Sequence, residues 1–232
     1  VARDTDRLAA AVNSLSATSD KVVGWTCDVT NDDSVASLFE RAKAEFERLD
    51  ALVNNVGVST RGELLGTPIA EFQRLWELNF LSVARCTKAA SPMLLESRGH
   101  VVNIGSLASK SAARYLGGYA PSKFAVAAYS QQLRYELAEC GVHVLLVCPG
   151  PLRRDDAGRR YSEQATGLPP SALKPGGGVK VKGIDPAWLA NRIVCACDRR
   201  ELEIVVPWKA RVLFALSQLS PSWGDWVLKR MT

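Results

Sequence analysis

Metal-ligand spacings and paired cysteines are missing from this sequence. Its six cysteines contain no Cys-x-x-Cys pair, and its two histidines, His100 and His143, lie far along the chain from any cluster of cysteines. Several of the cysteines stand inside apolar runs, which is typical of reduced, buried thiols. From the sequence we therefore expect no metal site.

Long apolar runs and a patterned basic patch are missing as well. No stretch has the length needed to span a bilayer. The net charge is +5, but the basic pairs are dispersed and are not interleaved with aromatic residues, which argues against nucleic-acid binding. A basic surface does suit an anionic ligand such as a phosphorylated cofactor. The 232 residues, 47% of them apolar, fit a single domain with a sizeable core.

Short apolar runs alternate with helical patterns along the chain. The runs are apolar on both faces, as buried parallel strands are, and they cover residues 21–28, 51–55, 100–106, 142–148 and 201–206. The helical patterns cover residues 4–15, 31–48, 68–96, 118–140 and 186–200, with Asn31 as an N-cap and with Pro92 expected to kink or end the third helix. The alternation predicts an α/β fold with a parallel sheet.

Two segments depart from this alternation. Glycine, proline and charged residues dominate residues 151–184, which predicts a loop that is either a functional lid lining the substrate pocket or a disordered segment. Residues 207–232 form an apolar tail, in which tryptophans and leucines recur at nearly helical spacing among cations over residues 208–230. Three explanations stay open for the tail: a helix at a membrane surface, a helix packed over the pocket, or a contact with another subunit.

The strongest chemical signal is the sequence Tyr119-Ala-Pro-Ser-Lys123. Residues four apart share a helix face, so the phenol and the ammonium can point into one site. An unperturbed tyrosine has a pKa near 10, and a neighbouring cation favours the phenolate and lowers that value. A chance pair on a solvated helix would look the same, so the motif alone is weak.

Polar residues elsewhere strengthen the signal. Ser106 follows the predicted strand at 100–106, and side chains at the carboxyl ends of parallel strands face the ligand crevice. The run Asn54-Asn55-Val56-Gly57 also ends a strand, and its glycine lets backbone approach a ligand closely. Asn79 lies inside a predicted helix, where a buried amide needs partners. A turn-capping serine and an ordinary glycine turn are the structural alternatives.

In this order and spacing, the residues resemble those of the short-chain dehydrogenase/reductase family. Asp28-Val29 matches its adenine-contacting position, residues 54–57 resemble its Asn-Asn-Ala-Gly motif, and Pro149-Gly150 resembles the turn beside its nicotinamide. The catalytic tetrad of the family is matched by Asn79, Ser106, Tyr119 and Lys123. The similarity covers residues 1–150 well and continues more loosely to residue 206.

The resemblance implies a fold, an activity and a role for each of these residues. The fold is a Rossmann-like, doubly wound parallel sheet with strand order 3-2-1-4-5-6-7, in one domain over residues 1–206. The activity is interconversion of a carbonyl and an alcohol with a nicotinamide cofactor. Tyr119 would be the general acid and base, Ser106 would hold the substrate oxygen, Lys123 would lower the tyrosine pKa and bind ribose, and Asn79 would order a water. Arg3, Asp28, Val29, Asn54, Gly57, Tyr119, Lys123, Pro149 and Gly150 would bind the cofactor.

The first residues bear on the choice of cofactor. Val1-Ala2-Arg3 matches the turn after the family's second strand, where an acidic residue would bond the ribose 2′-hydroxyl of NAD. Ala2 stands at that place, and Arg3 after it suits a 2′-phosphate. A helix-entry arginine that faces solvent would look the same. We expect NADP, with NAD as the alternative.

One element of the resemblance has no counterpart in the chain. The family's phosphate-binding turn, Thr-Gly-x-x-x-Gly-x-Gly, does not occur, and with it the first strand and first helix are expected upstream of Val1. The chain is then a piece of a longer protein, or another element replaces the turn. If it is a piece, we expect it to bind cofactor weakly, because the pyrophosphate-binding helix N-terminus would be missing.

Partners and location follow from the resemblance and the tail. We expect a small hydrophobic or lipid-like substrate, no nucleic acid, and a homodimer or homotetramer. We expect a cytoplasmic protein, with membrane contact through residues 208–230 as an alternative; targeting signals cannot be read from a chain that begins at Val1. Two other classes of function stay open, a non-catalytic binding or regulatory protein and a membrane-surface adaptor.

Overall fold

In the part of the chain that the structure describes, four parallel strands form one sheet. The computed structural model describes residues 1–19, 21–154, 161–162, 164–174 and 182–231. The sheet order is β1-β2-β3-β4, with the strands Ala51–Asn54, His100–Ile104, His143–Pro149 and Glu203–Val206. The predicted α/β fold with a parallel sheet is confirmed, and this order corresponds to positions 4-5-6-7 of the expected Rossmann-like sheet.

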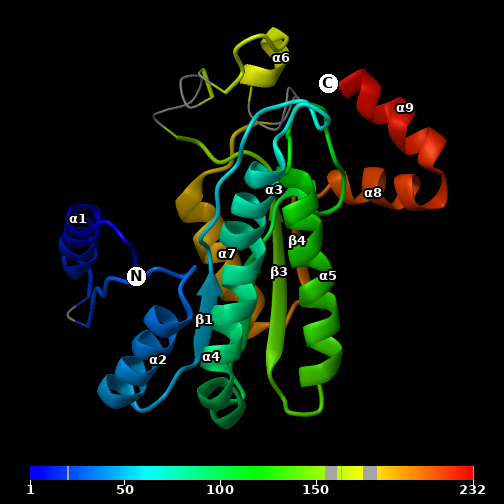
Figure 1. Cartoon of the computed structure of the whole chain (residues 1–232). Coiled ribbons are helices and arrows are strands. Elements are labelled where there is room, and N and C mark those ends of the chain that lie inside the picture. Colours follow the sequence, from blue (N-terminus) through cyan, green and yellow to red (C-terminus); the bar gives the residue numbers. More distant parts are fainter. Residues whose placement is uncertain (20, 155–160, 163, 175–181, 232) are drawn as a thin grey trace.

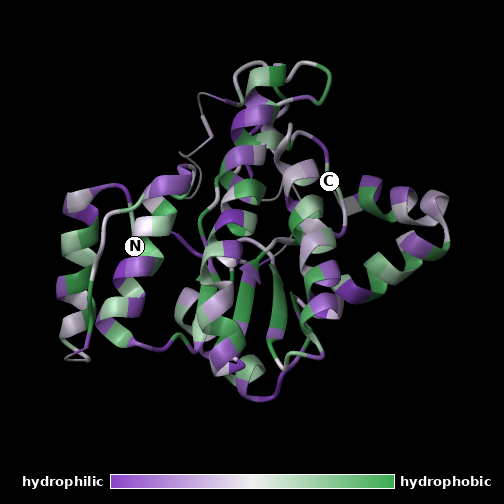
Figure 2. Cartoon of the chain, turned by 60° about the horizontal axis from the view of Figure 1, so that its bottom comes forward, coloured by the Kyte–Doolittle hydropathy of each residue, from purple (hydrophilic) through white to green (hydrophobic). Residues whose placement is uncertain are grey.

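Different helices cover the two faces of the sheet (Figure 1). On one face, Val101 and Val144 pack with Leu94 of α4 (Ser82–Ser97) and Leu133 of α5 (Tyr119–Leu137). On the other, Val102, Leu145 and Val147 pack with residues of α7 (Pro186–Asp198). Because each strand is covered on both sides, it reads as a continuous apolar run, and Figure 2 shows these strands as the apolar centre of the molecule.

Side-chain caps fix where the early helices begin. Asp4 caps α1 (Thr5–Ser16). The Asn31 side chain accepts a hydrogen bond from the Ser34 N–H at 2.8 Å, which confirms Asn31 as the N-cap of α2 (Asp32–Phe46). Each cap satisfies a backbone donor that has no partner within the helix.

The predicted strand at residues 21–28 is not a regular strand. The segment makes one isolated parallel bridge, Ala2 to Thr26, with the Ala2 N–H donating to the Trp25 carbonyl at 3.4 Å and the Cys27 N–H to the Ala2 carbonyl at 3.1 Å. A ladder needs successive pairs on a partner strand. Among the described residues, Ala2 supplies the one pair, so the apolar pattern does not become a strand.

The predicted long helix at residues 68–96 is three consecutive pieces. α3 (Ile69–Trp76) leads into a π-helical turn, η1 (Glu77–Leu81), and then into α4. The expectation that Pro92 kinks or ends the helix is wrong about an end, because α4 continues to Ser97. Proline leaves the carbonyl four residues earlier without its usual donor. That carbonyl, of Lys88, instead accepts the Ser91 hydroxyl at 2.8 Å.

The apolar tail forms two helices, α8 (Ala210–Leu219) and α9 (Pro221–Met231). Ala210 and Phe214 pack against the core cluster that contains Val205 of β4. Other apolar side chains of the tail are exposed, namely those of Trp208, Val212, Leu219, Trp223 and Trp226. Within the described residues, no helix has the length and apolarity to cross a bilayer.

Candidate active site

A cavity of about 1080 Å³ opens at the carboxyl ends of the strands. Its wall includes Ser106 after β2, Pro149 and Gly150 at the end of β3, and Val206 at the end of β4. This is the edge of a parallel sheet at which ligands bind, and the volume suits a small organic molecule.

Tyr119 begins α5 at the wall of this cavity. Burial raises the pKa of its phenol, while a hydrogen bond with the Ser106 side chain and the charges of Arg61 and Arg154 act in the opposite direction. Since the net effect is a raised pKa, the phenol is protonated at neutral pH. A protonated phenol on the wall of a cavity can donate its proton to a substrate bound there.

The Ser106 hydroxyl is held in place by a tight turn. Its Oγ accepts the Ala108 N–H at 3.1 Å, and the Ser106 N–H donates to the Ser109 hydroxyl at 3.1 Å. These reciprocal bonds form a capping box at the start of the short helix η2 (Leu107–Ser109). The turn therefore fixes the hydroxyl beside Tyr119 on the cavity wall.

Lys123 lies one helical turn after Tyr119 and is buried, with 5% of its surface exposed. Its Nζ donates to the Ile104 carbonyl at 2.8 Å, and burial lowers its pKa to about 8. Burial is the main cause of the raised Tyr119 pKa, and the cations whose charges oppose it are Arg61 and Arg154. The Lys123 ammonium is bound to the end of β2, and its effect on the tyrosine stays a prediction.

Asn79 is fully buried in the π-helical turn η1. Its Oδ1 accepts the Val58 N–H at 2.8 Å, and its Nδ2 donates to the Val58 carbonyl at 2.9 Å and to the Ser122 hydroxyl at 2.9 Å. Val58 lines the cavity and Asn79 lies behind it. The amide thus fastens the cavity wall to α5, and the π turn inserts the extra residue that aims it inward.

Replacing Asn79 with alanine should lower the free energy of unfolding by about 2–4 kcal/mol, because it removes the hydrogen-bond partner of both part-buried backbone groups of Val58 and of the buried Ser122 hydroxyl. Urea denaturation measures the change. Asn13→Ala, on an exposed position of α1, is the matched control and should change stability by less than about 0.5 kcal/mol. Equal effects of the two substitutions would contradict the assignment.

Gly57 lies close to the Asn79 amide and to the Lys123 ammonium. A Cβ at this position would lie 3.1 Å from the Asn79 Oδ1 and 3.3 Å from the Lys123 Nζ. Both Gly57 and Lys123 line the cavity. The glycine predicted from the sequence therefore leaves the lysine accessible from the cavity.

Other residues expected to bind a cofactor lie outside the cavity wall. The Arg3 guanidinium is 3.9 Å from the Asp28 carboxylate, and hydrogen bonds from Thr30 hold the Asp28 pKa below its usual value. The Val29 carbonyl accepts a bond from Arg85. The structure thus gathers Gly57, Ser106, Tyr119, Lys123, Pro149 and Gly150 around one cavity and places Arg3, Asp28 and Val29 apart from it.

Asn54 has a packing role in the described structure. Its Nδ2 donates to the Thr87 hydroxyl at 3.0 Å and to the Asn103 Oδ1 at 2.8 Å, and the side chain is buried. The next residue, Asn55, lines the cavity instead. Successive side chains at a strand end point to opposite sides, so one motif supplies both a packing amide and a cavity amide.

Arg61 and Tyr161 are cavity residues that the sequence reasoning missed. The Arg61 guanidinium lies 3.6 Å from the centroid of the Tyr161 ring, and its Nε donates to the Ala172 carbonyl at 2.8 Å. The Ser59 and Tyr161 hydroxyls are 2.5 Å apart. These contacts join residues about a hundred positions apart, so no local spacing in the sequence predicts them.

The predicted substrate loop at residues 151–184 contributes to the wall where it is described. Leu152, Tyr161, Leu173 and Ile184 line the cavity, whereas residues 155–160, 163 and 175–181 lie outside the described residues. The tail contributes Leu213, Phe214 and Leu228. Of the three explanations for the tail, a helix packed over the pocket therefore agrees with the described structure.

Comparisons with known proteins agree with this geometry. A family model described as short chain dehydrogenase matches residues 1–165. The ketoacyl reductase HetN of a Nostoc species is 27% identical over 233 residues, which cover 97% of this chain and 77% of that protein. A solved short-chain dehydrogenase from Streptomyces avermitilis is 28% identical with a TM-score of 0.78, covering 96% of this chain and 84% of its own. A short-chain dehydrogenase/reductase from Burkholderia phymatum, solved with NAD, is 23% identical with a TM-score of 0.77, covering 95% and 84%.

Proposed function

The chain belongs to the short-chain dehydrogenase family, and from that premise we propose that it interconverts a carbonyl and an alcohol with a nicotinamide cofactor. The observation that carries the proposal is one cavity wall bearing the Tyr119 phenol, the Ser106 hydroxyl and the Lys123 ammonium. A proton donor, an oxygen-binding hydroxyl and a buried cation are what reduction of a carbonyl requires from the protein.

Each side chain has a separate role in this reaction. Tyr119 donates its proton to the substrate oxygen in reduction and takes it back in oxidation. Ser106, fixed by its turn, donates a hydrogen bond to the same oxygen. A bound nicotinamide would supply or accept the hydride.

The described residues fit the nicotinamide half of such a cofactor. Lys123 has three N–H donors, and among the described residues one of them has a partner, the Ile104 carbonyl. The absence of a side chain at Gly57 leaves that ammonium accessible from the cavity. We propose that the other two donors bind ribose hydroxyls, with Pro149 and Gly150 beside the ring.

For the adenosine half we propose NADP rather than NAD, held by Arg3, Asp28, Val29 and the turn at Asn54. Arg3 is an exposed cation near the Asp28 carboxylate, placed to meet a 2′-phosphate. The NAD complex of the Burkholderia relative makes NAD the competing choice.

Arg3→Ala should weaken NADPH binding by about 10–100-fold and leave NADH binding nearly unchanged, because a hydrogen bond to a charged phosphate contributes about 1.5–3 kcal/mol. Fluorescence titration of the protein expressed from its complete reading frame measures both constants. The matched control is Arg7→Ala, which removes another exposed arginine in α1, paired with Asp4. Equal losses for NADPH and NADH would argue for NAD.

We propose a hydrophobic substrate, because apolar side chains form much of the cavity wall. They include Leu173, Trp188, Val206, Leu213, Phe214 and Leu228, and the same wall also carries the charged residues Arg154, Lys182, Asp185 and Lys209. A panel of ketones and aldehydes of increasing chain length should show kcat/KM rising roughly fourfold per methylene until the cavity is full. A preference for polyhydroxylated carbonyls would refute the hydrophobic substrate, and no turnover across the panel would favour the non-catalytic alternative.

The exposed apolar side of the tail is a further contact surface under this proposal. Trp208, Trp223 and Trp226 are each more than half exposed, and Arg230 stacks on the Trp226 ring at 3.8 Å. Such a surface suits a membrane that carries the substrate or a second subunit of a homodimer or homotetramer. A cytoplasmic location remains part of the proposal.

A further inference from the structure

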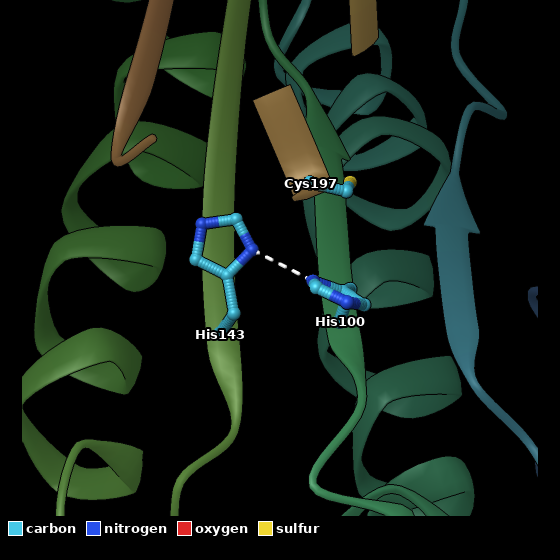
Figure 3. A group of neighbouring side chains, drawn as sticks. All are labelled: His100, His143 and Cys197. Atoms are coloured by element: carbon cyan, nitrogen blue, oxygen red, sulfur yellow. Dashed lines mark hydrogen bonds between the residues drawn. The ribbon is translucent and has the colours of Figure 1, made fainter. Parts of the chain in front are cut away.

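Two histidines and a cysteine that are distant in the sequence lie close together (Figure 3). They are at the amino ends of the central strands, at the opposite end of the sheet from the cavity. His100 and His143 are the first residues of β2 and β3 and are direct partners in the parallel register. Cys197 comes from the last turn of α7. One ligand atom from each, two ring nitrogens and a sulfur, all lie within 4.8 Å of one another. The sequence argument against a metal site relied on separation along the chain, and the strand register removes that separation.

The protonation state of His143 follows from its backbone partner. Its Nε2 is 2.8 Å from the Glu201 carbonyl oxygen, which can only accept, so Nε2 carries the hydrogen. The Nδ1 of His143 then presents a lone pair, which in the described structure accepts from the Nδ1 of His100 at 2.9 Å. A carbonyl that fixes the ring and its tautomer is the outer-shell partner that metal-binding histidines usually have.

We propose that His100, His143 and Cys197 form a binding site for a zinc ion, with the fourth coordination position left to water. Both rings offer Nδ1, and two neutral imidazoles with one thiolate are a donor set that zinc prefers.

The geometry needs small adjustments to hold the ion. Tetrahedral zinc with bonds of about 2.05 Å to nitrogen and about 2.3 Å to sulfur places the two nitrogens about 3.3 Å apart and the sulfur about 3.6 Å from each. The nitrogens must therefore open by a few tenths of an ångström from 2.9 Å. The sulfur can approach by rotation of the Cys197 side chain, which is only half-buried.

Zinc binding requires proton movements at His100 and at Cys197. His143 keeps its hydrogen on Nε2, and His100 exchanges its hydrogen from Nδ1 to Nε2 through solvent. The Cys197 thiol loses its proton, so each zinc bound releases one proton. The nearby charges are mixed, since Asp50 and Asp198 offset Arg200 at His100.

The site is separate from the candidate active site. His100 begins β2 and Ser106 follows its end, so about six residues of extended chain, roughly 20 Å, lie between them. Zinc there would touch neither substrate nor cofactor. It would join the end of α7 to two central strands and thereby stabilise the folded chain.

Metal titration of the complete protein without a histidine tag tests the proposal. Cobalt(II) replaces zinc as a spectroscopic probe and should give a thiolate-to-metal absorption band with tetrahedral ligand-field bands. Zinc affinity comes from competition with a chromophoric chelator. Cys197→Ser is the test variant, and Cys195→Ser, an exposed thiol two residues earlier on the same helix, is the matched control.

We expect one zinc per chain in the wild type and in Cys195→Ser, and an affinity at least about tenfold weaker in Cys197→Ser. At zinc concentrations 100-fold above Kd, the melting temperature should rise by about 5 °C or more. Unchanged zinc affinity in Cys197→Ser, or a cobalt complex of the wild type without the thiolate band, would overturn the proposal. The band keeps the test decisive even if the variant does not fold.

Discussion

Tyr119→Phe should lower kcat for carbonyl reduction by about 10²–10⁴-fold, which is the usual contribution of a positioned general acid. The substitution removes one oxygen and keeps the ring that fills the start of α5, so the fold and cofactor binding should persist. Since the pKa of the buried phenol is raised, the acid form is present at neutral pH. Oxidation needs the phenolate, so its rate in the wild type should increase as the pH is raised. Steady-state and single-turnover assays of the reactive member of the carbonyl panel measure the loss.

The matched control is Tyr135→Phe, which removes the hydroxyl of a largely exposed tyrosine on the same helix. It should leave kcat within twofold of the wild type, roughly the scatter expected for a surface change. A Tyr119→Phe enzyme with wild-type kcat would show that the proton reaches the substrate from another group. The assignment of Tyr119 would then be abandoned, even with the family membership intact.

Much of the fold follows from local patterns in the sequence. Each of the four strands coincides with an apolar run, and Asn31 caps its helix as expected. One error has a non-local cause and the other has a local one. The run at residues 21–28 has strand character, but its pairing depends on neighbours that its own sequence does not specify. Pro92 is accommodated because a serine one residue earlier bonds the freed carbonyl, a local rescue that a rule about proline alone overlooks.

The residues of the candidate site also fall into two groups, those that local sequence patterns predict and those that depend on packing. Tyr119 and Lys123 share a helix face by spacing alone, and Ser106 reaches the cavity because it follows a strand. Arg61 and Tyr161 meet through packing between distant segments, and His100 meets Cys197 through strand register and the end of a helix. Sequence spacing finds residues that one element brings together. It misses those that two or three elements bring together, because their distance depends on how the elements pack.

Lys123→Met should lower kcat/KM by about 100-fold or more and should also change how stability depends on pH. The pKa of Lys123 falls from its ordinary 10.5 to about 8 on burial. Between those two values the unfolded chain binds more protons than the folded chain, so stability rises with pH over this window. A difference of 2.5 pKa units corresponds to at most about 3 kcal/mol of unfolding free energy.

The variant has no such ionisation, so the component of stability that Lys123 contributes to the rise between pH 8 and pH 10.5 should vanish. Urea unfolding of both proteins at pH 7.5, 9 and 10.5 measures this, and the difference between them cancels other groups that titrate in the same range. Lys88→Met, at an exposed position of α4, is the control and should follow the wild-type curve. Parallel curves for Lys123→Met and the wild type would mean that the ammonium is solvated in solution, and a solvated lysine could not act as the buried cation that the proposed chemistry needs. Burial of the Lys123 charge therefore lowers the stability of the fold, and the proposed chemistry gives a functional reason for it.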